Sequence, residues 1–493
     1  MIKSRVRLVV SAWALSVIAA VASVRAATDE IRMALISTPP SLGNPFAAVG
    51  PPSSFVWQAI FDPLVAPGDD GALRPVLALT WTATSPTVWR FTLRPNVQFS
   101  NGEALDAEAV AATLMWLVGE VGRRTVIGAD VATIVQAKAV DPLTVDIITS
   151  EPDAVLPKRL APVAIVAPKA WADLGPDAFA QNPVGTGPFM LESWQTAQGQ
   201  IALVANASSW RRPKIERLTF IVTPDSVARA QSILAGQIDI ANVLSPDIVA
   251  QFETSEFRVV ESPTPQVYAL AFNTVGRLGS AIADHRVRQA INLAVDKNAI
   301  VDVMMHGRMR VAGQGATPMT FGYDPSIVPY AFDPDRARAL LREAGVEGRL
   351  SLSAEIVTNG MPGDPAFLSL IQQDLQRIGV DLEIRTIPFP DWLRKYLAGT
   401  FTVDMFGLSW NGAPSYDSAR AAEYFSCAKP RPFFCDPSLD PLFAAARREF
   451  DVEARRRILF DLARRLHDDP PALFLFEVAD LALVSPAVRN YRV

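Results

Sequence analysis

The feature that most constrains the fold is the repeated alternation of strand and helix patterns along the chain. Residues 218–223 have the pattern of a strand, and Asp225 then caps a helix that runs to Leu234. Gly236 ends this helix, and residues 238–240 begin the next strand. This order predicts a strand–helix–strand unit with parallel strands.

A second unit of the same kind lies at residues 350–387. Apolar residues alternate from Leu350 to Ile356, Asp364 and Pro365 open a helix, and Gly379 precedes the next alternating strand. Further elements are expected between and before these units. They are helices beginning at Asp106, Asp284, Asp296 and Asp333, and strands at 88–93 and 403–407. Two separate centres in 493 residues predict an α/β protein with two lobes.

The N-terminus has the pattern of a secretory signal. Basic residues come first, residues 8–21 are apolar, and Val24 and Ala26 place small residues at the positions that a signal peptidase reads. We therefore expect residues 1–26 to be removed and the mature protein to be periplasmic. A membrane anchor is the alternative, but the apolar stretch is short for a span. No Cys follows it, so lipid anchoring is not indicated.

The charge balance indicates what kind of partner to expect. Removing the four basic residues of the signal from the chain's 46 leaves 42 basic against 51 acidic residues, a net charge of −9. A net acidic surface argues against nucleic acid or an anionic membrane as partner.

Motifs of known chemistry are absent from the sequence. The three histidines have no second His or Cys at metal-ligand spacing, so we expect no zinc or iron site. No Gly-x-Ser-x-Gly elbow and no Gly-Lys-Ser/Thr phosphate loop occurs, and Gly185-Thr186-Gly187 continues into Pro188. We expect a binding protein without a cofactor, and not an enzyme.

Two loops are candidates for the binding site. One is residues 358–364, and the other follows Ser409 at the end of the 403–407 strand pattern. Ligands in open α/β sheets bind outside the carboxyl ends of the strands. If the two strands are parallel, both loops line one crevice.

Four ordered stretches resemble the peptide/nickel/opine class of extracytoplasmic solute-binding proteins, which serve ABC importers. They are "WRFTLR" at 89–94 with its continuation to 110, "NPVGTGPF" at 182–189, "HRVRQAINLAVDKNAI" at 285–300 and "FDPDRARALLREAG" at 332–345. The resemblance covers essentially the whole mature chain.

The resemblance implies the large, three-part type II fold of periplasmic binding proteins, with mixed sheets flanked by helices. Lobe I would comprise residues 27–263 and 474–493, with a subdomain inserted at 54–190, and lobe II would comprise residues 264–473. The lobes would close on a small solute, and the closed form would dock on a membrane permease. We expect a monomer.

Two of the motif residues are candidates for contact with the ligand. Thr186 lies between two glycines that suit a tight turn near the lobe crossing, and Asn273 lies at the crossover strand. A structural role in the turn or hinge is the alternative for each.

The sequence departs from the peptide binders at both charged anchors. Those relatives hold the peptide ammonium with an Asp three residues after a Trp. Here the Trp is Trp410 and the third residue on is Ala413. The dipeptide type holds the carboxylate with an Arg in the loop that corresponds to 358–364, but this loop, which contains Asn359 and Met361, has no Arg.

The remaining loop residues would form a different pocket. Trp410 offers a stacking face, Asn411 and Tyr416 offer neutral hydrogen bonds, and Asp417 offers one charge. Core packing is the alternative for Trp410, and a helix cap is the favoured role for Asp417.

A cysteine pair follows this loop. Cys427 and Cys435 match the cysteine pair of the dipeptide branch, and export favours one disulfide over two free thiols.

Three functions remain open. The first is a transport-coupled binding protein for an uncharged or singly charged organic solute, such as a sugar derivative, an opine or a modified peptide. The second is a dipeptide or oligopeptide binder with relocated anchors. The third is a periplasmic enzyme on the same scaffold.

Overall fold

A computed structural model describes residues 29–491 except residues 49, 51, 69, 278, 359, 362 and 363. The predicted signal at residues 1–26 lies outside the described residues. Within the described part of the chain, no helix combines the length and the apolar character that crossing a membrane requires.

The described strands form one large sheet and two smaller ones. The large sheet has the order β15-β14-β16-β12-β17-β11-β1-β10-β9-β8, and β13 pairs with β17 beside this path. Its strands are β1 Glu30–Leu35, β8 Phe189–Gln195, β9 Gln200–Ala205, β10 Arg217–Val222, β11 Ile240–Ala241, β12 Arg258–Phe272, β13 Arg310–Val311, β14 Leu350–Val357, β15 Val380–Ile387, β16 Met405–Asn411 and β17 Ala472–Val484.

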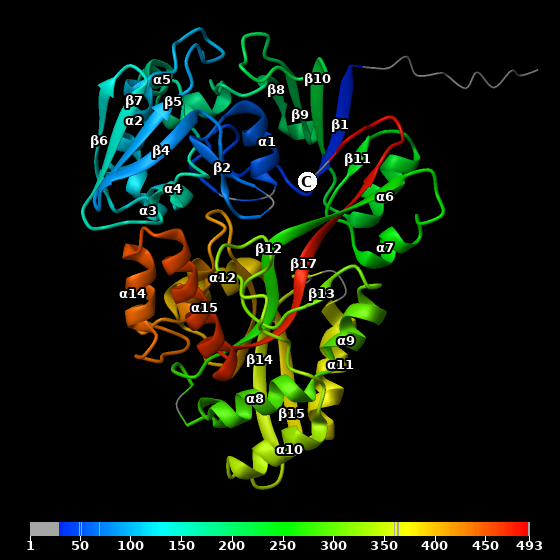
Figure 1. The fold of residues 1–493 in the computed structure, drawn as a ribbon. Coiled ribbons are helices and arrows are strands. Elements are labelled where there is room, and N and C mark those ends of the chain that lie inside the picture. The colour runs from blue at the N-terminus through cyan, green and yellow to red at the C-terminus, as the bar shows by residue number, and fades with distance from the viewer. Residues whose placement is uncertain are drawn as a thin grey trace, which may run out of the picture.

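Two long antiparallel strands, β12 and β17, run between an upper and a lower half of the molecule (Figure 1). The upper half holds β1 to β11 and α1 to α7, and the lower half holds β13 to β16 and α8 to α15. The register of β12 and β17 shifts between Pro263 and Val267. Proline has no backbone N–H to donate to the neighbouring strand. A register shift near Pro263 and Pro265 therefore avoids leaving a carbonyl of β17 without its donor. The predicted lobe boundaries at 263/264 and 473/474 fall inside these strands, and the division into lobes stays a prediction.

Both predicted strand–helix–strand units are present. β10 and β11 each pair in parallel with β1, and α6 between them begins after Asp225, which accepts a hydrogen bond from the Ala228 N–H. In the second unit β14 and β15 are parallel, with Leu350 opposite Val380. β16 is parallel to β14 as well, so the carboxyl ends of β14 and β16 lie at the same edge, as the loop prediction required.

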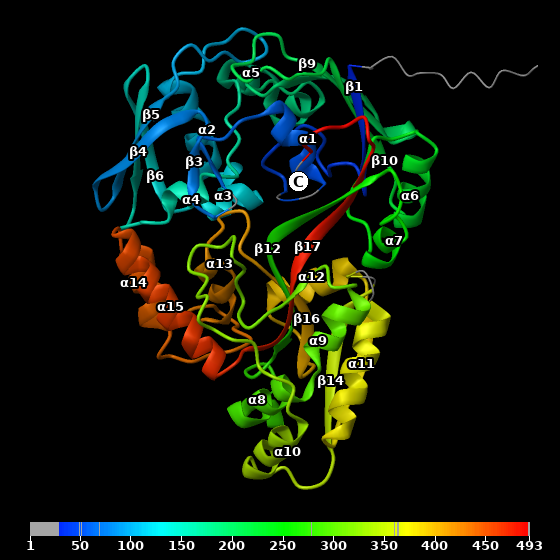
Figure 2. The same cartoon turned by 45° about the vertical axis from the view of Figure 1, so that its right-hand side comes forward.

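A separate four-stranded sheet, in the order β4-β5-β7-β6, forms the outer part of the upper half (Figures 1 and 2). The predicted strand at 88–93 is β5, and the helix predicted after Asp106 is α2. The remaining upper elements are β2 Val65–Pro67, β3 Leu73–Pro75, β4 Ala78–Ser85, β5 Val88–Leu93, β6 Ile134–Asp141, β7 Thr144–Thr149, α1 Ser53–Ile60, α2 Ala107–Val118, α3 Val126–Asp130, α4 Leu156–Arg159, α5 Pro168–Gln181, α6 Ser226–Leu234 and α7 Pro246–Ala250.

The lower half has helices on both faces of its sheet. β12 shows why, because Tyr268, Leu270 and Phe272 enter one buried core while Val267 and Ala269 enter the other. Both faces of the lower sheet are therefore buried away from water, which is typical of a sheet with parallel strands that helices cover on both sides. The helices are α8 His285–Ala294, α9 Lys297–Ala299, α10 Pro334–Glu343, α11 Asp364–Arg377, α12 Phe389–Ala398, α13 Ser418–Ala422, α14 Asp440–Arg448 and α15 Val452–Asp468.

Candidate functional site

The candidate site is the loop 412–417, which joins β16 to α13 at the edge of the lower sheet. The Gly412 N–H donates to the carbonyl of Pro265 at 2.8 Å, and the Tyr416 N–H donates back to the carbonyl of Gly412 at 2.7 Å. The Asn411 side chain accepts from the Ala413 N–H at 2.8 Å. These contacts tie the loop to the crossing strand β12, so its position depends on the same strands that join the two halves.

Trp410 packs in the core. Its ring stacks on Phe425 with centroids 4.4 Å apart and meets Phe474 edge-on at 5.1 Å, and only 2% of the residue is exposed. The strand β16 continues to Asn411, so Trp410 lies on a strand within the apolar layer. These contacts describe a core position, and a role of Trp410 in ligand binding stays a prediction.

Asp417 is held by a buried ion pair. Both carboxylate oxygens accept from the Arg455 guanidinium, at 2.6 and 3.0 Å, and one also accepts from the Ala419 N–H at the start of α13. Burial alone would raise the pKa of Asp417, but the Arg455 charge and hydrogen bonds hold it below its ordinary value. The predicted helix cap is confirmed, and the carboxylate is already paired within the protein.

Lys158, on α4 of the upper half, reaches the same loop. Its ammonium donates to the carbonyls of Gly71 at 2.9 Å and Tyr416 at 3.2 Å and lies 4.9 Å from the ring centroid of Phe321. Burial lowers the pKa of Lys158 to about 8, with Asp417 opposing this shift and Arg455 adding to it. Nothing in the sequence around Lys158 singled it out, because its partners Gly71 and Tyr416 are distant in the chain.

The two halves meet on both flanks of the crossing strands. On one flank the Ala154 N–H donates to the Arg447 carbonyl at 2.9 Å, and α14 lies below the four-stranded sheet in both views (Figures 1 and 2). On the other flank His306 lies 2.7 Å from Asp247, and Arg308 lies 2.6 Å from Glu253. The two halves are therefore in direct contact on both flanks of β12 and β17.

Thr186 and Asn273 both have structural partners. Thr186 is fully buried and donates to the Asp62 carboxylate at 2.8 Å. Asn273 is 1% exposed, and its amide donates to the carbonyls of Phe401 and Val403 at 3.0 Å each. The contacts of both residues therefore fit a structural role in the turn or hinge.

The second predicted loop, residues 358–364, is only partly described. Asn359 lies outside the described residues. The Met361 N–H donates to Asp364 at 2.7 Å, and burial raises the pKa of Asp364 to about 6. The roles of Asn359 and Met361 in ligand binding stay predictions.

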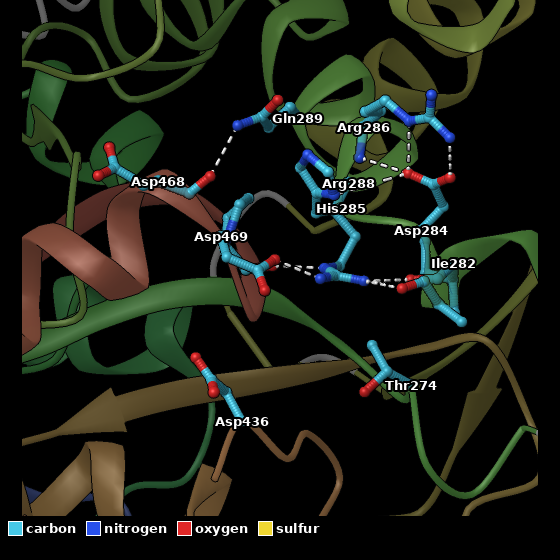
Figure 3. Close-up of polar contacts among 12 residues, drawn as sticks. Thr274, Ile282, Asp284, His285, Arg286, Arg288, Gln289, Asp436, Asp468 and Asp469 are labelled. Carbon is cyan, nitrogen blue, oxygen red and sulfur yellow. Dashed lines mark hydrogen bonds and ion pairs between the residues drawn. The ribbon is translucent and has the colours of Figure 1, made fainter. Parts of the chain in front are cut away.

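The motif at 285–300 also has a structural explanation (Figure 3). The Arg288 guanidinium donates to the carbonyls of Ile282 and Pro470 and pairs with Asp469, so it joins the start of α8 to the chain that enters β17. Gln289 donates to the Asp468 carbonyl at 2.7 Å. The motif thus ties α8 to the end of α15.

The predicted disulfide is confirmed, because Cys427 is bonded to Cys435. The described residues contain no group of three or more His, Cys, Asp or Glu side chains that is arranged to hold a metal ion.

Comparison with known proteins identifies the family. Residues 72–431 match the sequence profile of the middle region of the bacterial extracellular solute-binding proteins, family 5. The nickel-binding periplasmic protein of Escherichia coli K12 is 28% identical over 497 residues, spanning 94% of this chain and 92% of its own. The dipeptide-binding protein of the same organism is 28% identical over 374 residues, spanning 73% of this chain and 69% of its own.

A solved structure agrees with these matches. NikA from Brucella suis, in complex with Fe(III)-EDTA, has a TM-score of 0.81 and 27% identity, covering 94% of this chain and 97% of its own. The predicted α/β periplasmic-binding-protein fold and the predicted family are both confirmed. The chain belongs to family 5 of the bacterial extracellular solute-binding proteins, which capture a solute and deliver it to an ABC importer.

Proposed function

We propose that the mature protein captures one small organic solute between its upper and lower halves at the loop 412–417 and releases it to the permease unchanged. The observation that carries this proposal is the Lys158 contact. The partly buried side chain of Lys158, in the upper half, donates to the carbonyl of Tyr416 in the loop where the sequence predicts the pocket. A solute that touches both halves favours the closed form by its differential affinity for that form.

The contacts in this loop favour an uncharged or singly charged solute. Ala413 carries no charge, and the Asp417 carboxylate is already paired with Arg455. A zwitterion buried here would need a partner for each charge, because an unpaired buried charge costs several kcal/mol. Sugar derivatives and modified peptides therefore fit better than a free dipeptide. A peptide binder with relocated anchors remains the alternative within this class.

A nickel chelate is a second candidate, because the E. coli nickel-binding periplasmic protein matches 94% of this chain. The described residues do not gather a metal-ligand set. In this candidate an organic chelator would therefore supply most of the ligands, and the protein would recognise the complex.

We also propose that the protein functions as a periplasmic monomer that begins at Ala27, with lobe I formed by residues 27–263 and 474–493. The signal pattern and the family support this form. Intact-mass measurement of protein recovered from the periplasm tests the cleavage site, and a retained N-terminal segment would contradict it.

The test of the ligand proposal is mass spectrometry of whatever small molecule leaves the periplasmic protein on denaturation, followed by calorimetric titration of that molecule back into the protein. One organic solute recovered unaltered after incubation supports the proposal. A chemically changed product would favour the enzyme alternative. Titration with nickel chloride alone and with a nickel–histidine complex shows whether the protein binds the free metal ion or the chelate.

A further inference from the structure

A pocket of about 500 Å³ opens in the lower half beside β17. Its lining comes from residues 298–329 and from Glu477, so it includes no residue of the loop 412–417 and none of the upper half. The walls combine apolar side chains, such as Val301 and Ile327, with three charged groups and with the polar side chains of Asn298, Gln314 and Tyr323. Apolar walls that surround convergent polar groups are a usual form of a small-molecule site.

The carboxylate of Glu477 is the most unusual group in this pocket. Its side chain is only 12% exposed, and no hydrogen bond to its carboxylate occurs among the described residues. The nearest cation is the Arg310 guanidinium at 3.9 Å, which is itself 70% exposed. Burial raises the pKa of Glu477 to about 7, although Arg310 opposes the shift. A buried carboxylate without a hydrogen-bond donor is costly unless a partner arrives.

The charged groups around Glu477 leave the pocket acidic. Arg310 on β13 contributes one positive charge, and Asp302, in the π-helical segment Ile300–Met304, contributes a second carboxylate. Tyr323 also lines the pocket, and burial followed by the charge of Glu477 raises the pKa of Tyr323. With Glu477 ionised, the lining therefore carries one more negative than positive charge.

We propose that this pocket binds an organic primary ammonium group, which pairs with the Glu477 carboxylate while its hydrocarbon part lies against Val301 and Ile327. An ammonium supplies three donors and the opposite charge to a carboxylate that lacks a hydrogen-bond donor among the described residues. This second site is separate from the solute site between the halves, so either proposal can fail without the other.

The proposal fixes the direction of a pH effect. The ammonium pairs with the ionised carboxylate, and the pKa of Glu477 is about 7. Binding should therefore strengthen about tenfold between pH 6 and pH 8 and change little above that range.

Calorimetric titration of the full-length mature protein with n-pentylamine and with 1-pentanol tests the proposal directly. The amine should bind at least about 30-fold more tightly than the alcohol, because only the amine pairs with the charge. Titration with L-norleucine distinguishes an amino acid from a simple amine as the ligand that carries the ammonium. If L-norleucine binds as tightly as n-pentylamine, the ligand is an amino acid whose carboxylate reaches Arg310. If L-norleucine binds more weakly, the ligand is a simple amine.

Two variants locate the site. Glu477→Gln should weaken amine binding by about 30-fold or more. The control is Asp480→Asn, which should leave amine binding unchanged. Asp480 is another carboxylate on β17 whose pKa is raised by burial, but it does not line the pocket. The proposal is overturned if the wild-type protein binds the amine no better than the alcohol, or if Glu477→Gln binds the amine as the wild type does.

Discussion

The ammonium nitrogen of Lys158 lies 3.2 Å from the carbonyl oxygen of Tyr416, and these residues belong to opposite halves of the molecule. The same ammonium donates to Gly71, also in the upper half. The contact places the α4 segment directly on the loop that joins β16 to α13. Under the proposed function, a solute that moves this loop should therefore also change how the halves meet.

Gly71 gives a steric test of closure. A Cβ atom at this position would lie 2.3 Å from the carbonyl oxygen of Met319, which belongs to the lower half. Gly71→Ala should therefore hinder closure and lower solute affinity by about tenfold or more, since 1.4 kcal/mol already corresponds to a factor of ten. Calorimetric titration with the native solute measures the loss.

The matched control for this variant is Gly102→Ala. Both glycines have positive φ, +69° for Gly71 and +88° for Gly102, so both variants carry similar backbone strain of about 1 kcal/mol. Nothing lies within 4 Å of a Cβ atom at Gly102. Equal solute affinity in the two variants would show that the halves do not close as described.

Lys158 should make the proposed closure depend on pH. Its pKa is about 8 in the closed form, against an ordinary value of 10.5 in solvent. Below pH 8 both forms are protonated and closure is independent of pH. Between 8 and 10.5 closure releases a proton, so solute affinity should rise by up to about tenfold per pH unit.

Titration of the solute at a series of pH values checks this slope. Lys158→Met should abolish it, while Lys138→Met, which changes an exposed lysine on β6, should keep it. A slope that persists in Lys158→Met would assign the proton to another group.

The buried pair of Asp417 and Arg455 should be essential for stability. Asp417→Asn leaves Arg455 charged and without its carboxylate, which should cost about 3–5 kcal/mol of unfolding free energy. Glu453→Gln breaks an exposed pair with Arg456 on the same helix and should cost at most about 0.5 kcal/mol. Chemical denaturation measures both, and a similar small loss in the two variants would contradict this account.

Unmodified dipeptides and tripeptides should bind poorly. The resemblance to the peptide binders predicts the ammonium anchor at Ala413, which has no charge, and the nearby carboxylate of Asp417 is paired with Arg455. Losing a single charge partner typically costs about 2–5 kcal/mol of binding free energy. A calorimetric panel of free peptides that gives a dissociation constant at or below about 1 μM for any of them would show that the anchors are relocated.

The sequence was sufficient to predict the elements whose signals are local. Asp225, Asp284 and Asp333 cap helices where the pattern predicted them, and the two strand–helix–strand units follow from alternating apolar residues and terminal glycines. The parallel pairing of β14 with β16 then brings the two candidate loops to one edge. Each of these features depends on neighbours in the chain or on a general rule of sheet topology.

The details of the site depend on contacts that no local pattern encodes. Lys158 and Tyr416 are separated by 258 positions, and Arg455 is 38 positions from Asp417. The role of Trp410 was ambiguous for a different reason. Both faces of the lower sheet are buried, so the period of two along β16 could not separate a core position from a pocket position.

The most direct test of the central claim is hydrogen–deuterium exchange of the mature protein with and without its native solute. If the solute is held between the halves at the loop 412–417, amide exchange should slow on binding in two separate segments. These are the loop itself in the lower half and residues 154–160 around Lys158 in the upper half. Protection confined to one half, or no protection in either segment despite tight binding, would contradict the account.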